Sequence, residues 1–567
     1  MGTHSRSFDP SASVTTTAEH GQRVHRSTIE HMDRLARRMY VVRPGVWCLV
    51  GNGLSNQTFV EGPDGLIAID TGESVEEMRV ALDELRTHTT TPIVAVVYTH
   101  FHYVGGTTAI DGDVPVYGHR RIAANRARAG GEIAPMYGRG IVHQFGTSLP
   151  PDGPDGLVGV GLGRHFRDPA HAPFTPGHVP VDHPLEGGEE LDIAGLRVHV
   201  TAAPSDADDS VTLWFPDLGV GVHNLLWPAL FNVFAIRGEE FRDPRIILRG
   251  LDHLIALDAE HLVGTHGPPL SGRDEVRRRA TRARDAIQFL WDQTVRGMNL
   301  GWTNDELATR VRLPDHADDD FYTTEHYGVA EHHVRQIATG VRGWFGGDTA
   351  ELFPLEPHER ARRLIDGFGG SDAVRARATA ALGDDDLRWA LELASWLVTA
   401  ADDRDDAPAD DRTLLATVLR AIGQRTTAAN IRNWCLTAAR DLDGSTDLGR
   451  LRRHRLRAHQ VAAMSHEEVL DLMRVLLVPA RATGVDEHVA FVVDGGVRAG
   501  LHVRNSIARP TDGNGATALV RLDDEQWTAL VTGARAWSSI RTEVSIDGDG
   551  EAVDRLLACF DLAGSGA

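Results

Sequence analysis

Short apolar runs separated by turn residues occupy the first half of the chain, and apolar positions at helical spacing occupy most of the second half. Runs such as 39–50 and 65–69 end at Gly, Pro or Asp and therefore predict strands. Residues 73–86 follow these runs and place apolar side chains at the helical period. Strands that alternate with helices predict a layered α/β domain, which we expect over residues 36–275.

Helical periodicity continues from residue 276 to residue 446, where apolar residues recur three and four positions apart. This pattern predicts an all-helical domain. Alternating strand-like and helical segments return afterwards and predict a small α+β domain over residues 447–567. Residues 1–35 are rich in Ser, Thr and His, and we expect them to form a flexible tail.

Composition makes several classes of partner improbable. The chain has 58 Lys and Arg against 80 Asp and Glu, a net charge of −22 that disfavours binding to nucleic acid or anionic membranes. Its three cysteines form no CxxC pair, so we expect neither a disulfide framework nor a thiolate zinc site. No secretion signal is visible in residues 1–30 and no run reaches the length of a membrane span. These features predict a cytoplasmic protein.

Candidate chemistry begins where the strand predicted at residues 93–97 leads into His100 and His102. Two histidines at this spacing after a strand can direct both imidazoles to one point, as metal sites often require. Gly105 and Gly106 let the backbone pass close to such a site. The buried strand before the histidines and the glycine pair after them favour a metal site over two surface histidines.

Acidic and histidine side chains also border other predicted strands. Asp206, Asp208 and Asp209 precede one strand, and His223 and His266 each follow another. A single residue in such a place is most often a turn residue or a helix cap. The repeated placement at several strand ends favours a shared metal site at one edge of a sheet.

Several segments in sequence order resemble the alkylsulfatase branch of the metallo-β-lactamase-fold hydrolases; they are THFHYVGG, PSDADDS with LWFPD, LFNVFAIRG and GTHGPP. The later segment HYGVAEHHVRQIATGVRGWFGG is similar to that family's helical dimerisation domain, and the C-terminal segment resembles its sterol-carrier-like domain. The resemblance implies an αββα sandwich, an all-α dimerisation domain and a small α+β domain. It also implies a homodimeric, zinc-dependent hydrolase that acts on small amphiphilic esters, namely long-chain alkyl sulfates.

The metal motif of that family is HxHxDH, and its Asp–His pair is absent here after His102. That pair helps to hold a second zinc in the family, and a family glutamate that bridges the metals aligns with Asn224. We therefore expect one zinc, held by nitrogen and oxygen ligands, and leave a second zinc open. The expected ligands are His100, His102, His266 and a carboxylate from Asp208 or Asp209, with His223 as a possible substitute.

The resemblance also assigns substrate and catalytic roles. Arg237 and Arg139 match arginines expected near the sulfate, which an arginine fork can bind through two oxygens. Asn232 lies close to Arg237 in sequence and is expected to donate to the sulfate. Tyr327 and His332 fall where the helical domain closes over the active site, and His332 is the candidate general acid for the leaving alcohol.

Three functions stay open at this stage. The first is hydrolysis of alkyl sulfates, and the second is hydrolysis of another ester on the same fold, because this scaffold supports many hydrolytic reactions. The third is a dimeric amphiphile-binding protein that has lost its metal. The missing Asp–His pair favours the third function, whereas the retained histidines and arginines favour the first.

Overall fold

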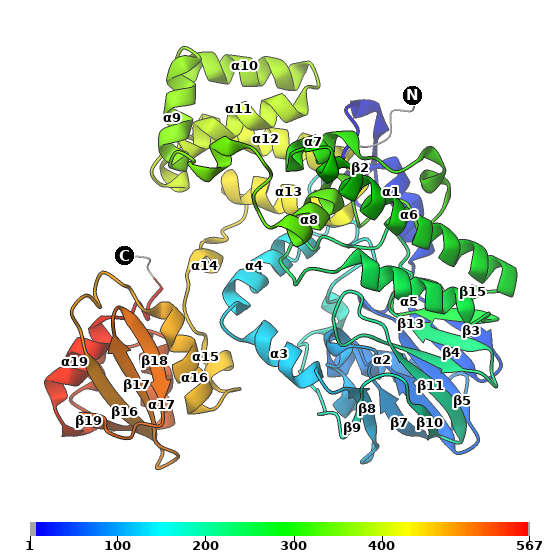
Figure 1. The fold of residues 1–567 in the computed structure, drawn as a ribbon, viewed down its shortest axis with the longest axis horizontal. Coiled ribbons are helices and arrows are strands. Elements are labelled where there is room, and N and C mark those ends of the chain that lie inside the picture. Colours follow the sequence, from blue (N-terminus) through cyan, green and yellow to red (C-terminus); the bar gives the residue numbers. More distant parts are fainter. Residues whose placement is uncertain (1–6, 565–567) are drawn as a thin grey trace. The chain divides into compact units, whose positions relative to one another are not determined.

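The computed structural model describes residues 7–564 of the chain (Figure 1). Contacts between Cα atoms divide the chain into two compact units. The first unit consists of Met1–Arg126 and Gly140–Thr446, and the second of Ala127–Arg139 and Asp447–Ala567. Each unit has its own sheets and its own apolar core.

Two mixed β-sheets form the first part of the larger unit. The seven-stranded sheet has the order β3-β4-β5-β6-β7-β8-β9 and the six-stranded sheet the order β10-β11-β12-β13-β14-β15. Their bounds are β3 Arg38–Arg43, β4 Val46–Val50, β5 Gln57–Gly62, β6 Gly65–Ile69, β7 Ile93–Val97, β8 Val116–His119, β9 His183–Leu185, β10 Glu190–Ile193, β11 Leu196–Ala202, β12 Val211–Phe215, β13 Val220–His223, β14 His261–Gly264 and β15 Leu270–Ser271.

The two sheets pack face to face. Side chains two positions apart, such as Val46 and Cys48 in β4 and Val211 and Leu213 in β12, enter one buried core between them. Helix α2 (Val75–Leu85) connects the parallel strands β6 and β7, and α5 (Pro244–Ala256) connects the parallel strands β13 and β14. Because the inner faces already meet, such crossover helices cover the outer faces. The predicted αββα sandwich is confirmed.

Helices form the remainder of the larger unit, as the 3.6-residue periodicity predicted (Figure 1). They are α6 Arg273–Asn299, α7 Asn304–Arg310, α8 Ala330–Arg342, α9 Pro357–Gly367, α10 Ser371–Gly383, α11 Leu387–Thr399, α12 Ala409–Arg425 and α13 Ala429–Leu442. One apolar core joins Leu251 of α5, Leu290 of α6 and Ile337 of α8. One continuous apolar core therefore contains residues from both sides of the predicted domain border at residue 275.

Most of the predicted flexible tail has regular structure, so that prediction is wrong for residues 7–35; residues 1–6 lie outside the described residues. This segment contains β1 (Thr15–Thr17), β2 (Arg23–His25) and α1 (Arg26–Arg34). Buried side chains hold it in place: the ring of His31 stacks on that of His326 at a centroid distance of 4.2 Å. Polar composition was a poor guide here, because a few buried contacts with distant residues fix the segment.

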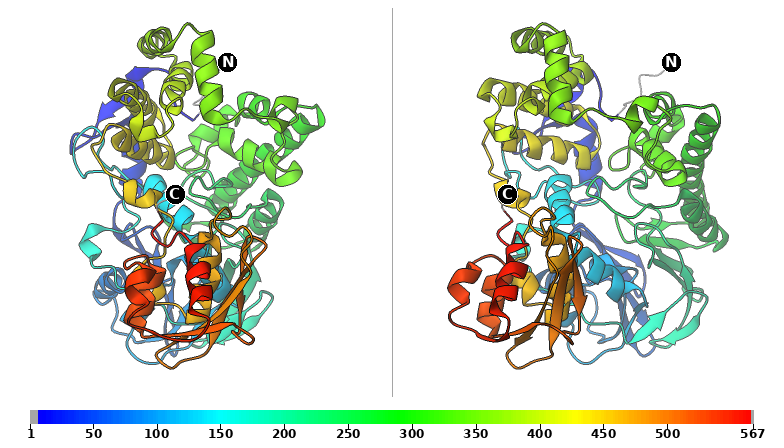
Figure 2. Two further views of the ribbon diagram at one scale, coloured as in Figure 1. Left: turned by 90° about the vertical axis from the view of Figure 1, so that its left-hand side faces the viewer. Right: turned by 60° about the vertical axis from the view of Figure 1, so that its left-hand side comes forward.

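The smaller unit is an α+β domain, as expected (Figure 2). Its sheet has the order β18-β17-β16-β19-β20. The bounds are β16 Glu487–Val493, β17 Ala499–Arg504, β18 Ile507–Thr511, β19 Ala518–Leu522, β20 Ser545–Gly548, α14 Gly449–Arg452, α15 Ala458–Val461, α16 His466–Met473, α17 Asp524–Val531, α18 Trp537–Ile540 and α19 Gly550–Ala558. Within residues 7–564 the helices lack the combination of length and hydropathy that a membrane span requires.

Candidate metal centre

His100 follows the buried strand β7 and is itself fully buried. Its Nδ1 atom lies 2.8 Å from Oγ1 of Thr99, and that hydroxyl donates to Oδ2 of Asp70 at 2.7 Å. Because the hydroxyl proton goes to Asp70, the Thr99 oxygen accepts from Nδ1–H of His100. The Nε2 atom of His100 therefore carries the lone pair and can bind a metal ion.

Asp206 supplies the carboxylate of the centre. It lies in the loop between β11 and β12, with Oδ2 3.1 Å from Nδ1 of His102 and Oδ1 3.6 Å from Nε2 of His100. One ligand atom from each of these three residues lies within 4.8 Å of the others. Burial alone would raise the pKa of Asp206, but His100 and His102 lower this pKa well below its usual value.

These three residues fit one metal ion. The Nε2 atom of His102 is buried and has no hydrogen-bond partner within residues 7–564, and Oε1 of Glu239 lies 3.7 Å from it. Two imidazoles and one carboxylate are a common donor set for a catalytic zinc, which keeps a fourth position open. Asn224 orients the carboxylate, because its Nδ2 donates to Oδ1 of Asp206 at 2.5 Å and its Oδ1 accepts from Nε1 of Trp227 at 3.0 Å.

The structure corrects the predicted carboxylate ligand. Asp208 is outside the group of three and binds Nδ2 of Asn125 at 2.8 Å and Nη2 of Arg121 at 2.5 Å. Asp209 is fully buried, but it does not belong to the group of His100, His102 and Asp206, whose ligand atoms lie close to one another. Asp206 was visible in the sequence as the first acid of the same triplet. The loop has no regular spacing of apolar and polar residues, so the sequence does not predict which way the Asp206 side chain points.

His223 and His266 also lie outside the group of three. The Nδ1 atom of His223 accepts from the backbone N–H groups two and three residues further along, at 3.2 and 3.3 Å. The Nδ1 atom of His266 donates to the carbonyl of Leu54 at 2.9 Å, and its Nε2 atom lies 3.4 Å from the hydroxyl of Tyr103. The structure therefore gives both histidines protein partners.

Arg237 and Asn232 are both buried, and their predicted roles in sulfate binding stay predictions. Nη2 of Arg237 lies 2.8 Å from Oε1 of Glu239, which itself approaches His102. The amide of Asn232 has no hydrogen-bond partner among the described residues. Arg139 lies on helix α4 (Ala134–Phe145), in the segment that groups with the smaller unit, so its predicted role stays a prediction.

Tyr327 and His332 come from the loop before α8 and from α8 itself. The hydroxyl of Tyr327 accepts from Nε2 of Gln144 at 2.9 Å, and its ring lies 5.8 Å from that of Trp227. His332 is partly buried, with Nε2 3.5 Å from Oγ of Ser7. The structure places Tyr327 near Trp227 and His332 beside the N-terminal segment.

Comparison with known proteins identifies the family. A family model described as alkyl sulfatase dimerisation matches residues 303–445. A linear primary-alkylsulfatase of Pseudomonas sp. is 33% identical over 528 residues, which cover 89% of this chain and 98% of that protein. The chain belongs to the alkylsulfatase family. A solved structure of this family, the stereoselective inverting sec-alkylsulfatase Pisa1 from Pseudomonas sp., matches with a TM-score of 0.82 at 25% identity, over 96% of this chain and 87% of that chain.

The same family includes a relative from Saccharomyces cerevisiae, the alkyl/aryl-sulfatase BDS1, which is 26% identical over 548 residues, covering 92% of this chain and 82% of that protein. These matches confirm the resemblance drawn from the sequence motifs. The matched dimerisation segment also falls within the helices predicted over residues 276–446.

Arg242 is a buried arginine that sequence reasoning missed. Its Nη1 atom donates to the backbone carbonyl of Asn232 at 2.6 Å, and its guanidinium carbon lies 5.9 Å from the ring centre of Trp227. The remaining nitrogens Nε and Nη2 are buried without a hydrogen-bond partner in the described part of the chain. Nothing in the sequence separates this arginine from the many surface arginines.

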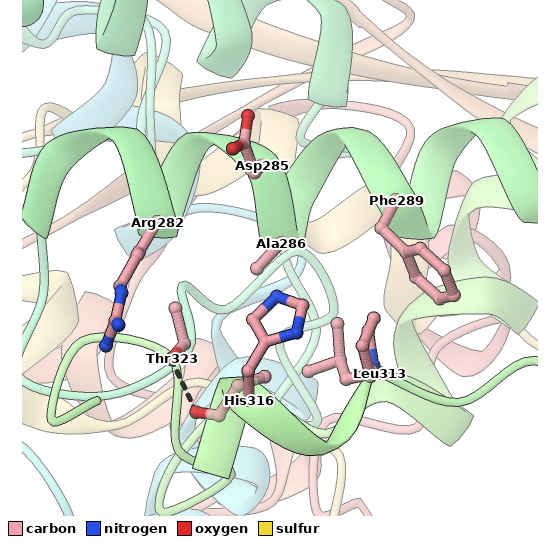
Figure 3. A pocket seen from close by; sticks show the side chains of 9 residues that line it. Arg282, Asp285, Ala286, Phe289, Leu313, His316 and Thr323 are labelled. Carbon is pink, nitrogen blue, oxygen red and sulfur yellow. Dashed lines mark hydrogen bonds between the residues drawn. The ribbon is translucent and has the colours of Figure 1, made fainter. Parts of the chain in front are cut away.

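A separate hollow of about 260 Å³ lies between α6 and residues 313–323 (Figure 3). Its wall includes Arg282, Phe289, Leu313 and His316. None of the residues predicted to bind metal or substrate lines it, so this hollow is distinct from the candidate centre.

Proposed function

We propose that this chain hydrolyses alkyl sulfate esters to sulfate and an alcohol, with one zinc held by His100, His102 and Asp206. The supporting observation is the buried group of two imidazoles and one carboxylate with mutual ligand spacing, in a chain of the alkylsulfatase family. A bound zinc would supply a water of lowered pKa and a Lewis acid for the ester oxygen. The chain's own residues would supply substrate binding and proton transfer.

Sulfate binding falls to Arg237, Asn232 and Arg242. The Nε–H and Nη2–H groups of Arg242 point along one edge of the guanidinium, and such an edge binds two oxygens of a tetrahedral oxyanion. A buried guanidinium with two unpartnered nitrogens is costly, and an anionic substrate would relieve this cost. Asn232 adds an amide donor that has no other acceptor within residues 7–564.

His332 would deliver the proton to the departing alcohol oxygen, and Tyr327 would supply a second hydroxyl. Burial lowers the pKa of His332, while the adjacent Glu331 carboxylate opposes this shift. Oγ of Ser7 lies near both side chains: it donates to Oε2 of Glu331 at 2.8 Å and lies 3.5 Å from Nε2 of His332. The N-terminal segment thus helps to orient the proposed acid.

The chain would act as a homodimer through its helical segment. The segment matched by the dimerisation family model exposes large apolar side chains, including Trp344, Leu352, Phe353 and Leu355. Trp344 is 62% exposed and Phe353 is 81% exposed. Exposed apolar side chains this close together in sequence are typical of a surface that a partner covers.

The test is release of inorganic sulfate from dodecyl sulfate by the zinc-loaded protein and by the His100→Ala variant. We expect release by the wild type and a loss of at least roughly 100-fold in the variant, because a metal ligand is removed. Binding of dodecyl sulfate by both proteins without release by either would instead support the amphiphile-binding alternative. Turnover of a carboxylic ester alone would point to a different hydrolase.

A further inference from the structure

We propose that the metal centre takes a single ion and that His266, whose Nε2 atom faces the Tyr103 hydroxyl, is not one of its ligands. This inference rests on the proposed function, since it concerns the same centre. It removes His266 from the set of metal ligands and makes it a positioning residue for Tyr103.

The rings of three residues meet at this point. The ring of Tyr103 lies edge-on to that of His100, with centroids 5.1 Å apart, and edge-on to that of His266, with centroids 5.4 Å apart. Tyr103 is 4% exposed, so its ring is packed and has little room to move. It therefore fills space between the two histidines.

The hydrogen bonds of His266 fix its tautomer. The carbonyl of Leu54 can only accept, so Nδ1 of His266 carries the proton in the 2.9 Å contact. Nε2 then has the lone pair, and the hydroxyl of Tyr103, 3.4 Å away, is the donor that faces it. Metal binding through Nε2 would have to displace this buried hydroxyl.

The residues around His266 do not form a second set of three metal ligands within residues 7–564. Both oxygens of Asp70 accept from Thr99, at 2.8 and 2.7 Å. Asn224 places a neutral amide beside Asp206, with its Nδ2 donating to the carboxylate. Among residues 7–564, no group of three His, Cys, Asp or Glu with ligand atoms within 4.8 Å of one another includes His266. A second divalent ion at His266 would thus lack the three protein ligands that a zinc site requires.

Metal stoichiometry measures this directly. Metal-free protein is titrated with Co²⁺, whose visible absorption reports the number and type of ligands, and zinc content per chain is measured by mass spectrometry. We expect saturation at one equivalent in the wild type, in Tyr103→Phe and in His266→Ala, with the Co²⁺ spectrum of His266→Ala unchanged. The visible absorption of bound Co²⁺ should be absent in His100→Ala.

Saturation at two equivalents in the wild type would overturn the inference without the need for any variant. A fall in stoichiometry or an altered Co²⁺ spectrum in His266→Ala, confirmed in His266→Asn with a normal circular dichroism spectrum, would also overturn it. Failure of the proposed function is distinguishable, because stoichiometry is measured without substrate. One metal without sulfate release contradicts the proposed hydrolysis alone. Two metals with sulfate release leave the hydrolysis standing and contradict the single-ion centre.

Discussion

Nδ1 of His102 and Oδ2 of Asp206 lie 3.1 Å apart, and Asp206 is nearly inaccessible to solvent. Burial alone would lower the pKa of His102, but the Asp206 carboxylate raises it, to about 9, and Glu239 adds to this effect. In the metal-free protein this pair is therefore an imidazolium with a carboxylate at neutral pH. A metal ion must displace the imidazolium proton, because only the neutral imidazole is a ligand.

Zinc affinity should consequently depend on pH. His102 is protonated below its pKa of about 9, so the apparent affinity should fall as the pH drops from 8.5 to 6.5. The expected slope is roughly tenfold per pH unit, for one proton displaced per metal. Calorimetry in buffers of different ionisation enthalpy measures the released proton. An affinity that stays constant over this range would show that His102 is already neutral.

Asp206 is the carboxylate that the metal requires. Asp206→Asn should lower zinc affinity by at least roughly 100-fold, because removal of a ligand costs more than loss of a residue that only supports one. Asp208→Asn is the matched control, since Asp208 binds Asn125 and Arg121 instead. Zinc competition with a chromogenic chelator gives both affinities. Equal losses in the two variants would contradict the assignment.

Arg242 should anchor the substrate rather than the fold. Arg242→Gln is expected to lower kcat/KM for dodecyl sulfate by about 10- to 100-fold, in line with about 1.5–3 kcal/mol for hydrogen bonds to a charged group. Thermal stability should hold or rise, because a buried charge with two unpartnered nitrogens is removed.

The exposed Arg245, paired with Asp243, provides the control as Arg245→Gln. This variant should retain the wild-type kcat/KM. A large loss of melting temperature in Arg242→Gln together with unchanged kcat/KM would assign Arg242 a purely structural role.

Dimerisation should depend on the exposed apolar residues of the helical segment. Phe353→Asp, at a position that is 81% exposed, should convert the dimer to a monomer because a charge would be buried in the interface. Val497→Asp is the control, since Val497 is 70% exposed but lies outside the matched dimerisation segment. Light scattering separates the two states. A dimer that survives the Phe353 substitution would place the interface elsewhere.

Sequence patterns predicted the layered fold because each sheet strand and crossover helix has its own apolar period. The same logic placed His100 and His102, since a buried strand ends just before them. It selected Asp208 or Asp209 and passed over Asp206, because the three share a loop without regular spacing. Nor could it pair Tyr103 with His266, because that contact joins two segments 163 residues apart in sequence.

The most direct test of the central claim is an activity titration. Metal-free protein receives increasing zinc, and inorganic sulfate released from dodecyl sulfate is measured by ion chromatography at each step. The account predicts that sulfate release rises in proportion to zinc, reaches a plateau at one equivalent per chain and disappears in Asp206→Asn. Absence of sulfate at every zinc level, or undiminished release after chelation, would contradict it.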